Sequence, residues 1–296
     1  MTSEITLFVN PTAGRGRGAH AAQPAASALR DAGFSVRTVL GEDAGDALRR
    51  AREAVAAGTG ALIAVGGDGL ASLALQAVAG TGTPLGVVAV GTGNDFARAL
   101  GLPIRDPAAA GALAARALKA GGHRDIDLGR AGERWFGSVL ASGFDSRVND
   151  RGNRMRWVGG RFKYDLAILA ELAAFAPIPY RIRLDGGEVR EIEATLIAVG
   201  NGTTYGGGMR ICAGAEMDDG LFDVTVVGEC SRITLLKVFP RVYKGTHLSH
   251  PAVTTHRVSS IELAAAGVTA YADGEPLGAL PLTATCVPGA VRVLTG

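Results

Sequence analysis

Three glycine-rich turns, each preceded by a short apolar run, are the residues of this chain that are best suited to bind phosphate. They run from Gly14 to Gly18, from Gly66 to Gly69 and from Gly91 to Asn94. Glycines let backbone N–H groups approach phosphate oxygens, and a following helix N-terminus favours negative charge. The second and third turns also carry aspartates, Asp68 and Asp95. Because a carboxylate repels a phosphate unless a cation lies between them, the pattern predicts a Mg²⁺-dependent phosphate site.

Two common nucleotide-binding motifs do not account for these turns. The sequence GTGNDF, residues 91–96, has phenylalanine where a dinucleotide-binding fingerprint needs its third glycine. The sequence also has no Walker lysine motif. We therefore expect the phosphates to be held by backbone N–H groups, by the metal and by the available arginines, Arg15, Arg17 and Arg98.

The first third of the chain alternates apolar runs with helix-like stretches. A strand, a glycine turn and a helix, repeated four times, are typical of a parallel sheet covered by helices on both faces. Ligands bind such sheets at the carboxyl ends of the strands, where the three turns lie. The expected strands are 5–9, 34–40, 61–65 and 84–90. One expected helix ends near residue 32, and the others span 44–57, 70–79, 96–100 and 108–120.

From about residue 125 the pattern changes to alternating and β-branched segments bounded by turn residues. Only Tyr164–Phe175 and Arg232–Val242 are helix-like there. Many strands with few helices predict an antiparallel β-sandwich. The fold class is thus an N-terminal three-layer α/β nucleotide-binding domain, residues 1–124, followed by a β-sandwich domain, residues 125–296, whose last segment returns to either domain. The expected strand segments are 135–142, 180–186, 192–201, 221–228, 254–263 and 268–275.

Composition restricts the setting and the partners of the chain. With 296 residues and 47% hydrophobic residues, it can bury a full core without disulfides. A net charge of +2 gives no general basic field, so nucleic acid is not an expected partner. Three widely spaced cysteines and an N-terminus without a signal-peptide pattern predict a cytoplasmic protein. The longest apolar stretch, 166–176, contains Glu171 and is too short to span a membrane.

A local basic cluster precedes that apolar stretch. Cations beside an apolar helix suit peripheral contact with an anionic membrane, but a solvated face beside a core helix explains the pattern equally well. The cluster contains Arg147, Arg151, Arg154, Arg156, Arg161 and Lys163.

Motifs along essentially the whole chain resemble those of the bacterial diacylglycerol kinase and sphingosine-kinase-like lipid kinase family. They are NPTAGRGRG (10–18), VGGDG (65–69), GTGNDFARALGLP (91–103), IDLG (126–129), GFDS (143–146), YGGG (205–208), DDGLFDV (218–224) and YADGE (271–275). GFDSRVNDRGNRMRW is especially similar to the actinobacterial branch. The resemblance implies an ATP- and Mg²⁺-dependent kinase that phosphorylates a lipid hydroxyl at a membrane surface, with diacylglycerol as the leading acceptor and a lipid-binding second domain.

The resemblance also implies residue roles. Asp273 is expected to be the general base, and Asp68, Asp95 and Asp127 are expected to position the catalytic Mg²⁺. The Asp219 carboxylate, with the carbonyls of Glu216 and Leu221, is expected to hold a second, structural Mg²⁺, although the spacing alone favours an Asp-Gly turn at 219–220. The expected ATP-binding residues are Asn10, Thr38, Gly66, Gly67, Asp68, Gly69, Leu70, Ala71, Ser72, Thr92, Gly93, Asn94 and Arg98.

One position departs from the family pattern. The family usually has threonine after GGDG, whereas this chain has Leu70 and has no acid in the helix that follows. Leucine is expected to lie beside the phosphates and to weaken ATP binding, which keeps a non-catalytic lipid- or nucleotide-binding regulator open as an alternative. A second alternative is an NAD kinase-like enzyme, although its downstream Asn-Glu pair is missing. The sequence leaves open which lipid is the acceptor and whether the chain forms a homodimer.

Overall fold

The computed structural model describes residues 4–143 and 177–296 of the chain. Its N-terminal part is built on a parallel sheet in the order β2-β1-β3-β4. All five residues of β3 and of β4 are buried, as expected for central strands covered on both faces. The strands are β1 (Glu4–Val9), β2 (Ser35–Val39), β3 (Leu62–Gly66) and β4 (Leu85–Ala89).

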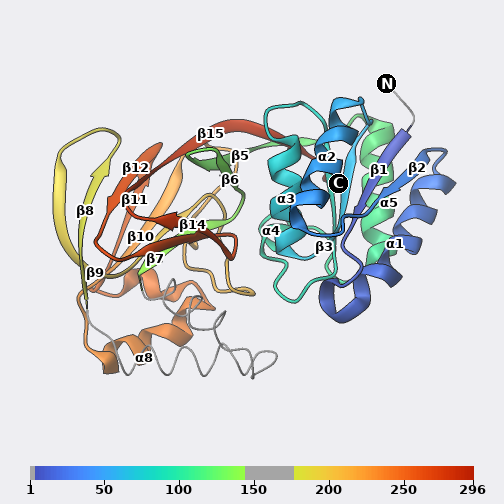
Figure 1. Cartoon of the computed structure of the whole chain (residues 1–296). Helices are drawn as coiled ribbons and strands as arrows, with labels where there is room; N and C mark the ends of the chain where they lie inside the picture. The colour runs from blue at the N-terminus through green and yellow to red at the C-terminus, as the bar shows by residue number, and fades with distance from the viewer. Residues whose placement is uncertain (1–3, 144–176) are drawn as a thin grey trace.

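Helices cover both faces of this sheet, which confirms the three-layer prediction. Figure 1 shows α1 and α5 on one side of the sheet and α2 and α3 on the other. Many of the buried helical residues are alanines, so the helices pack closely. At the crossing of α1 and α5, a Cβ on Gly111 would lie 2.8 Å from the Cα of Ala25, so glycine is required there. The helices are α1 (Ala13–Asp31), α2 (Ala44–Ala56), α3 (Asp68–Val78), α4 (Asp95–Ala99) and α5 (Pro107–Ala120).

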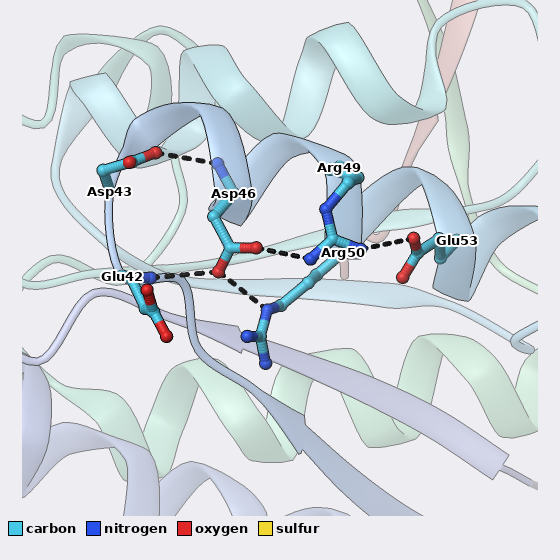
Figure 2. A network of polar contacts seen from close by, with 6 residues as sticks. All are labelled: Glu42, Asp43, Asp46, Arg49, Arg50 and Glu53. Carbon is cyan, nitrogen blue, oxygen red and sulfur yellow. Dashed lines mark hydrogen bonds and ion pairs between the residues drawn. The ribbon is translucent and has the colours of Figure 1, made fainter.

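Charged side chains stabilise the exposed start of α2 (Figure 2). The carboxylate of Asp43 accepts the N–H of Asp46 at 2.8 Å and caps the helix. Asp46 in turn binds the guanidinium groups of Arg49 and Arg50, and Arg49 also binds Glu53. These pairs are three or four residues apart, as neighbours on a helix surface are. The network fixes a local helix and takes no part in the glycine turns.

The remaining strands of the described chain are antiparallel except at one contact, and they form the predicted β-sandwich. The central strand β9 pairs with β7, β8 and β10. The core between the strands includes Phe136 stacked on Phe222, with ring centroids 5.7 Å apart. The strands are β5 (Arg124–Ala131), β6 (Arg134–Phe136), β7 (Val139–Gly143), β8 (Ile178–Leu184), β9 (Val189–Gly200), β10 (Phe222–Gly228), β11 (Val253–Val258), β12 (Ser260–Ala264), β13 (Thr269–Ala272), β14 (Glu275–Ala279) and β15 (Leu282–Val293).

Two further elements complete the sandwich part of the described chain. Helix α8 (Arg232–Val242) has the limits that the sequence predicts, and a short 3₁₀ helix, η1 (Thr246–Ser249), follows it. The predicted single strand at 254–263 is instead two strands, β11 and β12, which meet around Ser259 and pair with different neighbours. The predicted helix at 164–175 lies outside the described residues.

The last strand physically joins the two parts of the chain. β15 pairs with β5 and β12 in the sandwich, and its Val293 pairs in parallel with Leu85 of β4. The N–H of Leu294 then donates to the carbonyl of Leu85 at 2.8 Å. A second link is the amide of Gln76 on α3, which exchanges two hydrogen bonds with the backbone of Trp135. The domain boundary at residue 124 stays a prediction.

Removing the side chain of Leu294 tests how much this return of the chain contributes to stability. Leu294 is buried in the core beneath α1 and α5. We expect Leu294→Ala to lower the free energy of unfolding by about 2–5 kcal/mol, because it leaves a cavity. Leu40→Ala, at an exposed position, is the matched control and should stay within about 0.5 kcal/mol of wild type. Equal urea midpoints for the two variants would contradict the role of Leu294.

Candidate active site

The three glycine turns meet at one edge of the parallel sheet, because β1, β3 and β4 are neighbours. The N–H of Asn10 donates to the carbonyl of Val65, and that of Val90 donates to the carbonyl of Gly66. The second and third turns are in backbone contact: a Cβ on Gly91 would lie 2.5 Å from the Cα of Gly67. Any larger residue at position 91 would separate the two turns.

Asp68, which is the first residue of α3, positions the third turn. Its carboxylate accepts the N–H groups of Asn94 at 2.6 Å and Asp95 at 2.7 Å, and that of Phe96 at 3.4 Å. These are the free N–H groups at the start of α4, which a carboxylate stabilises. Asn94 adopts a left-handed conformation with φ of 60°, so the chain turns sharply into α4. Asp68 therefore fixes the path of residues 94–96.

Asp95 binds backbone N–H groups in the second half of the chain in the same way. Its carboxylate oxygens accept the N–H groups of Gly207 at 2.7 Å and Gly208 at 2.8 Å, in the YGGG motif. The residue is buried, and this burial raises the pKa of the Asp95 carboxyl. The negative charge of Asp68 adds to the increase in pKa, whereas the N–H bonds and Arg98 oppose it.

The carboxylates of Asp68 and Asp95 converge on Gly93. A Cβ at Gly93 would lie 2.7 Å from one oxygen of Asp68 and 3.2 Å from one oxygen of Asp95. Two hard oxygen ligands from separate turns suit a divalent cation such as Mg²⁺. Backbone glycine leaves space beside them, and the donor chemistry fits the predicted cation. The described residues contain no group of three or more His, Cys, Asp or Glu side chains that could hold a metal by themselves.

Asp273 lies at the turn between β13 and β14, with φ of 51°. Its carboxylate accepts the N–H groups of Gly137 at 2.8 Å and Ser138 at 2.9 Å. Desolvation raises its pKa to about 6, and the negative charge of Asp68 contributes, against the two N–H bonds. A Cβ on Gly69 would lie 3.6 Å from a carboxylate oxygen of Glu275, two residues after Asp273, so the turn that carries Asp273 lies near the second glycine turn. Asp273 is thus a carboxylate that is ionised at neutral pH and more basic than an exposed aspartate.

Asp127 is held in a different environment from Asp68 and Asp95. It is buried in β5, and its carboxylate accepts the N–H groups of Gly220 at 2.6 Å and Gly289 at 2.8 Å. Burial is the main cause of the raised pKa of the Cys286 thiol, and the negative charges of Asp127 and Asp219 raise this pKa further. The structure therefore places Asp127 beside the predicted distal metal residues. Its expected role in positioning the catalytic Mg²⁺ stays a prediction.

At the predicted distal metal site, the carboxylate of Asp219 is already paired with an arginine side chain. One oxygen accepts the N–H of Leu221 at 2.9 Å, and the other pairs with the guanidinium of Arg257. The nearby Asp223 has a buried carboxylate oxygen without a hydrogen bond, which lies 3.7 Å from the Nε of Arg257. Burial raises the pKa of Asp223, and the charge of Arg257 opposes the increase. The negative charge of Glu216 contributes to this increase. The oxygen-rich surroundings fit Mg²⁺, which would share Asp219 with Arg257.

The structure corrects the expected position of the Leu70 side chain. Leu70 is only 5% exposed and belongs to the core cluster beneath α2 and α3. A Cβ on Gly66 would lie 2.8 Å from its Cβ and Cδ2 atoms, so the side chain points back toward strand β3. Helical side chains lean toward the N-terminus of their helix, which explains this direction. Ala71 and Ser72 are buried as well, so a phosphate at this turn would meet backbone.

The other predicted nucleotide-binding residues surround the same edge of the sheet. Asn10 uses its side-chain oxygen to accept the N–H and hydroxyl of Thr12, which shapes the first turn. Arg98 donates to the carbonyl of Gly93 at 3.2 Å and is exposed, as are Thr92 and Thr38. Thr38 lies on the edge strand β2.

Arg17 was predicted to bind phosphate, and it lies at the third turn. Its guanidinium donates to the carbonyl of Gly91 at 3.4 Å. The side chain of Arg15 lies outside the described part of the chain.

Two residues that support the site are missing from the sequence prediction. Asn201 is fully buried, and its amide donates to the carbonyls of Asp127 at 2.8 Å and Gly137 at 3.0 Å. It thereby joins the surroundings of Asp127 to the loop that holds Asp273. Gly137 is also required for packing, because a Cβ there would lie 2.6 Å from the ring of Phe96. The sequence signal was weak: each is a small or polar residue just beyond an apolar strand.

The sequence patterns of two known domains match the chain. The diacylglycerol kinase catalytic domain matches residues 4–131, and the YegS C-terminal NAD kinase beta sandwich-like domain matches residues 138–295. A diacylglycerol kinase of Mycobacterium tuberculosis is 44% identical over 296 residues, which cover 98% of this chain and 94% of that protein. A diacylglycerol kinase of Staphylococcus aureus is 28% identical over 285 residues, covering 95% and 89%.

Solved structures share the fold. A diacylglycerol kinase from Bacillus anthracis has a TM-score of 0.79 at 24% identity, covering 99% of this chain and 97% of that chain. An NAD kinase from Archaeoglobus fulgidus, in complex with ATP, has a TM-score of 0.58 at 14% identity, covering 100% and 94%. At these identities the likeness shows the fold alone.

The fold combines an α/β domain that carries the glycine turns with a β-sandwich, and the 44% identity to a diacylglycerol kinase over nearly the whole chain shows that the protein is a kinase. The chain belongs to the diacylglycerol kinase family, and it is a lipid kinase of that family. Of the described helices, none is both long and apolar enough to cross a membrane.

Substituting Gly93 tests the convergence of the two carboxylates. We expect Gly93→Ala to lower kinase activity at least tenfold and the free energy of unfolding by about 1–3 kcal/mol, because the Cβ would enter the space beside Asp68 and Asp95. Gly122→Ala is the control, since its Cβ would make only ordinary contacts with Ala117. Full activity and wild-type stability of Gly93→Ala would show that this space is not used.

Proposed function

We propose that this chain transfers the γ-phosphate of ATP to the hydroxyl of diacylglycerol and so produces phosphatidic acid. The observation that carries the proposal is Asp273, a carboxylate of raised pKa beside the acid-bearing glycine turn at Asp68. The diacylglycerol kinases of M. tuberculosis and S. aureus, which match most of the chain, support the choice of acceptor.

In the proposed reaction, Asp273 accepts the proton of the lipid hydroxyl as its oxygen attacks the γ-phosphorus. The bond between that phosphorus and the bridging oxygen of ADP breaks, and ADP leaves with the bond electrons. Phosphoryl transfer needs mainly alignment and charge neutralisation, so a carboxylate is an adequate base. The N–H groups of Gly137 and Ser138 hold the carboxylate in place for this step.

The phosphates of ATP are proposed to lie against the second and third glycine turns. The N-terminus of α3, which has 11 residues, presents a partial positive charge to them. Arg98 and Arg17 already bind carbonyls of the third turn and leave further guanidinium N–H groups for phosphate. Asp68 and Asp95 would hold Mg²⁺, which neutralises charge that develops on the phosphoryl group.

We also propose that the enzyme works at the cytoplasmic surface of a membrane. The basic cluster at 147–163 and the apolar stretch that suggested this contact lie outside the described residues. The three cysteines are free of disulfide bonds, which is consistent with a reducing compartment.

An acceptor assay with labelled ATP tests the proposed reaction. Diacylglycerol, ceramide, sphingosine, monoacylglycerol and an undecaprenol-like alcohol are presented in mixed micelles, and NAD is presented in solution. We expect diacylglycerol to give the highest kcat/KM. Phosphorylation of NAD, or ATP binding without transfer to any acceptor, would contradict the proposal.

Asp273→Asn is expected to lower kcat roughly 10²-fold or more, because an amide cannot accept the hydroxyl proton. The KM for ATP should change little, and the fold should be kept with a free energy of unfolding lower by about 1.5–3 kcal/mol, because the amide keeps only one of the two acceptor oxygens. Near-normal turnover in the folded variant would remove Asp273 from the mechanism.

The pH profile provides the second measurement on Asp273. Its pKa is raised from 3.8 to about 6, so the group is ionised above pH 6 and protonated below it. Since only the ionised form accepts a proton, kcat/KM should fall roughly tenfold per pH unit below about pH 6. A profile that stays flat down to pH 5 would contradict this assignment.

The distal metal is tested through stability. We expect Mg²⁺ to raise the melting temperature of the wild type by a few degrees, because it binds only the folded site. Asp219→Ala should reduce this Mg²⁺-dependent increase, because the distal site is lost while the proposed site at Asp68 and Asp95 remains. Asp218→Ala is the matched control: Asp218 is adjacent and pairs with Arg124, so its variant should keep the increase. Because Asp219→Ala also loses the ion pair with Arg257, its melting temperature falls both in Mg²⁺ and in chelator. The quantity to compare between proteins is therefore the melting temperature in Mg²⁺ minus that in chelator.

A further inference from the structure

Helix α8 carries most of the large apolar side chains that are exposed in the described part of the chain. Ile233 is 66% exposed, Leu236 is 52% exposed and Tyr243, the residue that ends the helix, is 43% exposed. The two others, Leu40 and Val189, lie singly on other elements. Isolated exposed apolar residues are normal, but three on one short helix mark an interaction surface.

These side chains form one stripe, opposite the face that packs on the sandwich. At about 100° per residue, Ile233, Leu236 and Tyr243 lie within about 80° of each other around the helix axis. The buried residues Leu235, Val238 and Val242 lie on the other side. The helix is therefore apolar on two faces, and within residues 4–143 and 177–296 only one of them is covered. The ring of Tyr243 is held edge-on by Phe239, with centroids 6.2 Å apart.

The stripe is bordered by cations and by no carboxylate of its own segment. Lys237 and Lys244 fall on one edge of the stripe and Arg232 on the other, by the same helical spacing. Between Glu229 and Glu262 the sequence contains no acidic residue. A basic helix with an aromatic residue and exposed aliphatic side chains is typical of helices that lie in the interface of an anionic bilayer.

We propose that this surface docks on an anionic phospholipid bilayer. The α8 surface consists of Ile233, Leu236, Lys237, Tyr243 and Lys244. Its cations complement acidic headgroups, and its apolar stripe enters the acyl boundary. A helix of 11 residues is roughly 16 Å long and about 10 Å wide, so its outer face covers roughly 160 Å², far below the roughly 800 Å² per partner of a stable protein interface.

The position of α8 places the proposed bilayer on the side of the active site. In Figure 1, α8 lies along the lower edge of the sandwich, and β1 and β3 point their carboxyl ends to the same lower side. The end of α8 also contacts the segment after the YGGG motif: the N–H of Arg210 donates to the carbonyl of Val242 at 3.1 Å. Because Asp95 binds Gly207 and Gly208, docking would anchor the helix next to a loop of the site.

Vesicle flotation without ATP tests the proposal. Vesicles of phosphatidylglycerol and phosphatidylcholine are compared with phosphatidylcholine alone, using wild type and the double variant Ile233→Ser with Leu236→Ser. We expect the variant to lose at least roughly tenfold in partition coefficient on the anionic vesicles, since two large apolar side chains are removed. The control, Leu40→Ser with Val189→Ser, removes the two large exposed apolar residues that lie on other described elements and should stay within about twofold of wild type.

A charge variant keeps the test decisive if the apolar variant is unstable. Lys237→Glu with Lys244→Glu leaves the packed face of α8 unchanged, and it should bind anionic vesicles at least roughly tenfold more weakly. Wild-type binding by both variants, or equal loss in the Leu40 and Val189 control, would overturn the proposal. So would a wild-type dimer in light scattering that becomes a monomer in the apolar variant while vesicle binding is unchanged, because the surface would then join two copies.

The inference rests on the proposed function only for its consequence in catalysis. With diacylglycerol in anionic vesicles, the apolar variant should lose activity at least roughly tenfold, whereas a short-chain, water-soluble diacylglycerol should be phosphorylated at the wild-type rate. Absence of kinase activity on both substrates would contradict the proposed function and leave the flotation result as the test of the docking surface. Equal loss on both substrates would contradict the role of docking.

Discussion

Carboxylates that accept backbone N–H groups of glycine-rich loops are the interaction on which the site depends. Asp68 binds the turn at 94–96, Asp95 binds Gly207 and Gly208, and Asp273 binds Gly137 and Ser138. Each hydrogen bond to a charged group contributes about 1.5–3 kcal/mol. The acids that could do chemistry are therefore also the acids that hold the loops in place. Glycine is favoured at positions 207 and 208 of this set because both have positive φ, of 85° and 110°.

The same arrangement has an electrostatic cost that favours a cation. Asp68 and Asp95 converge on Gly93, and burial together with the Asp68 charge raises the pKa of Asp95. The charge of Asp68 also contributes to the raised pKa of Asp273. Backbone N–H groups reduce this repulsion but do not neutralise it. A divalent cation would neutralise it, and it would also bring a phosphate to carboxylates that otherwise repel it. We propose that this cation is the Mg²⁺ of the bound nucleotide.

The sequence predicted the parts of this structure that depend on local pattern. The parallel sheet, its glycine turns and the limits of α8 follow from the spacing of apolar residues and glycines. The sequence did not reveal that Asp273 binds Gly137 and Ser138, because the partners are 136 and 135 residues apart. It also misplaced the side chain of Leu70, because family likeness assigned the position to phosphate whereas the direction of helical side chains turns it into the core.

The two halves of the chain are joined across the site, which restricts how the enzyme can move. Asp95 of the first half binds the YGGG loop of the second, Gln76 on α3 binds the backbone of Trp135, and β15 pairs with β4 at Val293. Separating the halves would break charge-assisted bonds and strand pairing together. The two halves therefore form one frame around the site. The YGGG loop connects this frame to α8, because it binds Asp95 and the nearby Arg210 binds the end of α8. A bilayer bound at α8 would then hold the frame in place while the lipid headgroup reaches Asp273.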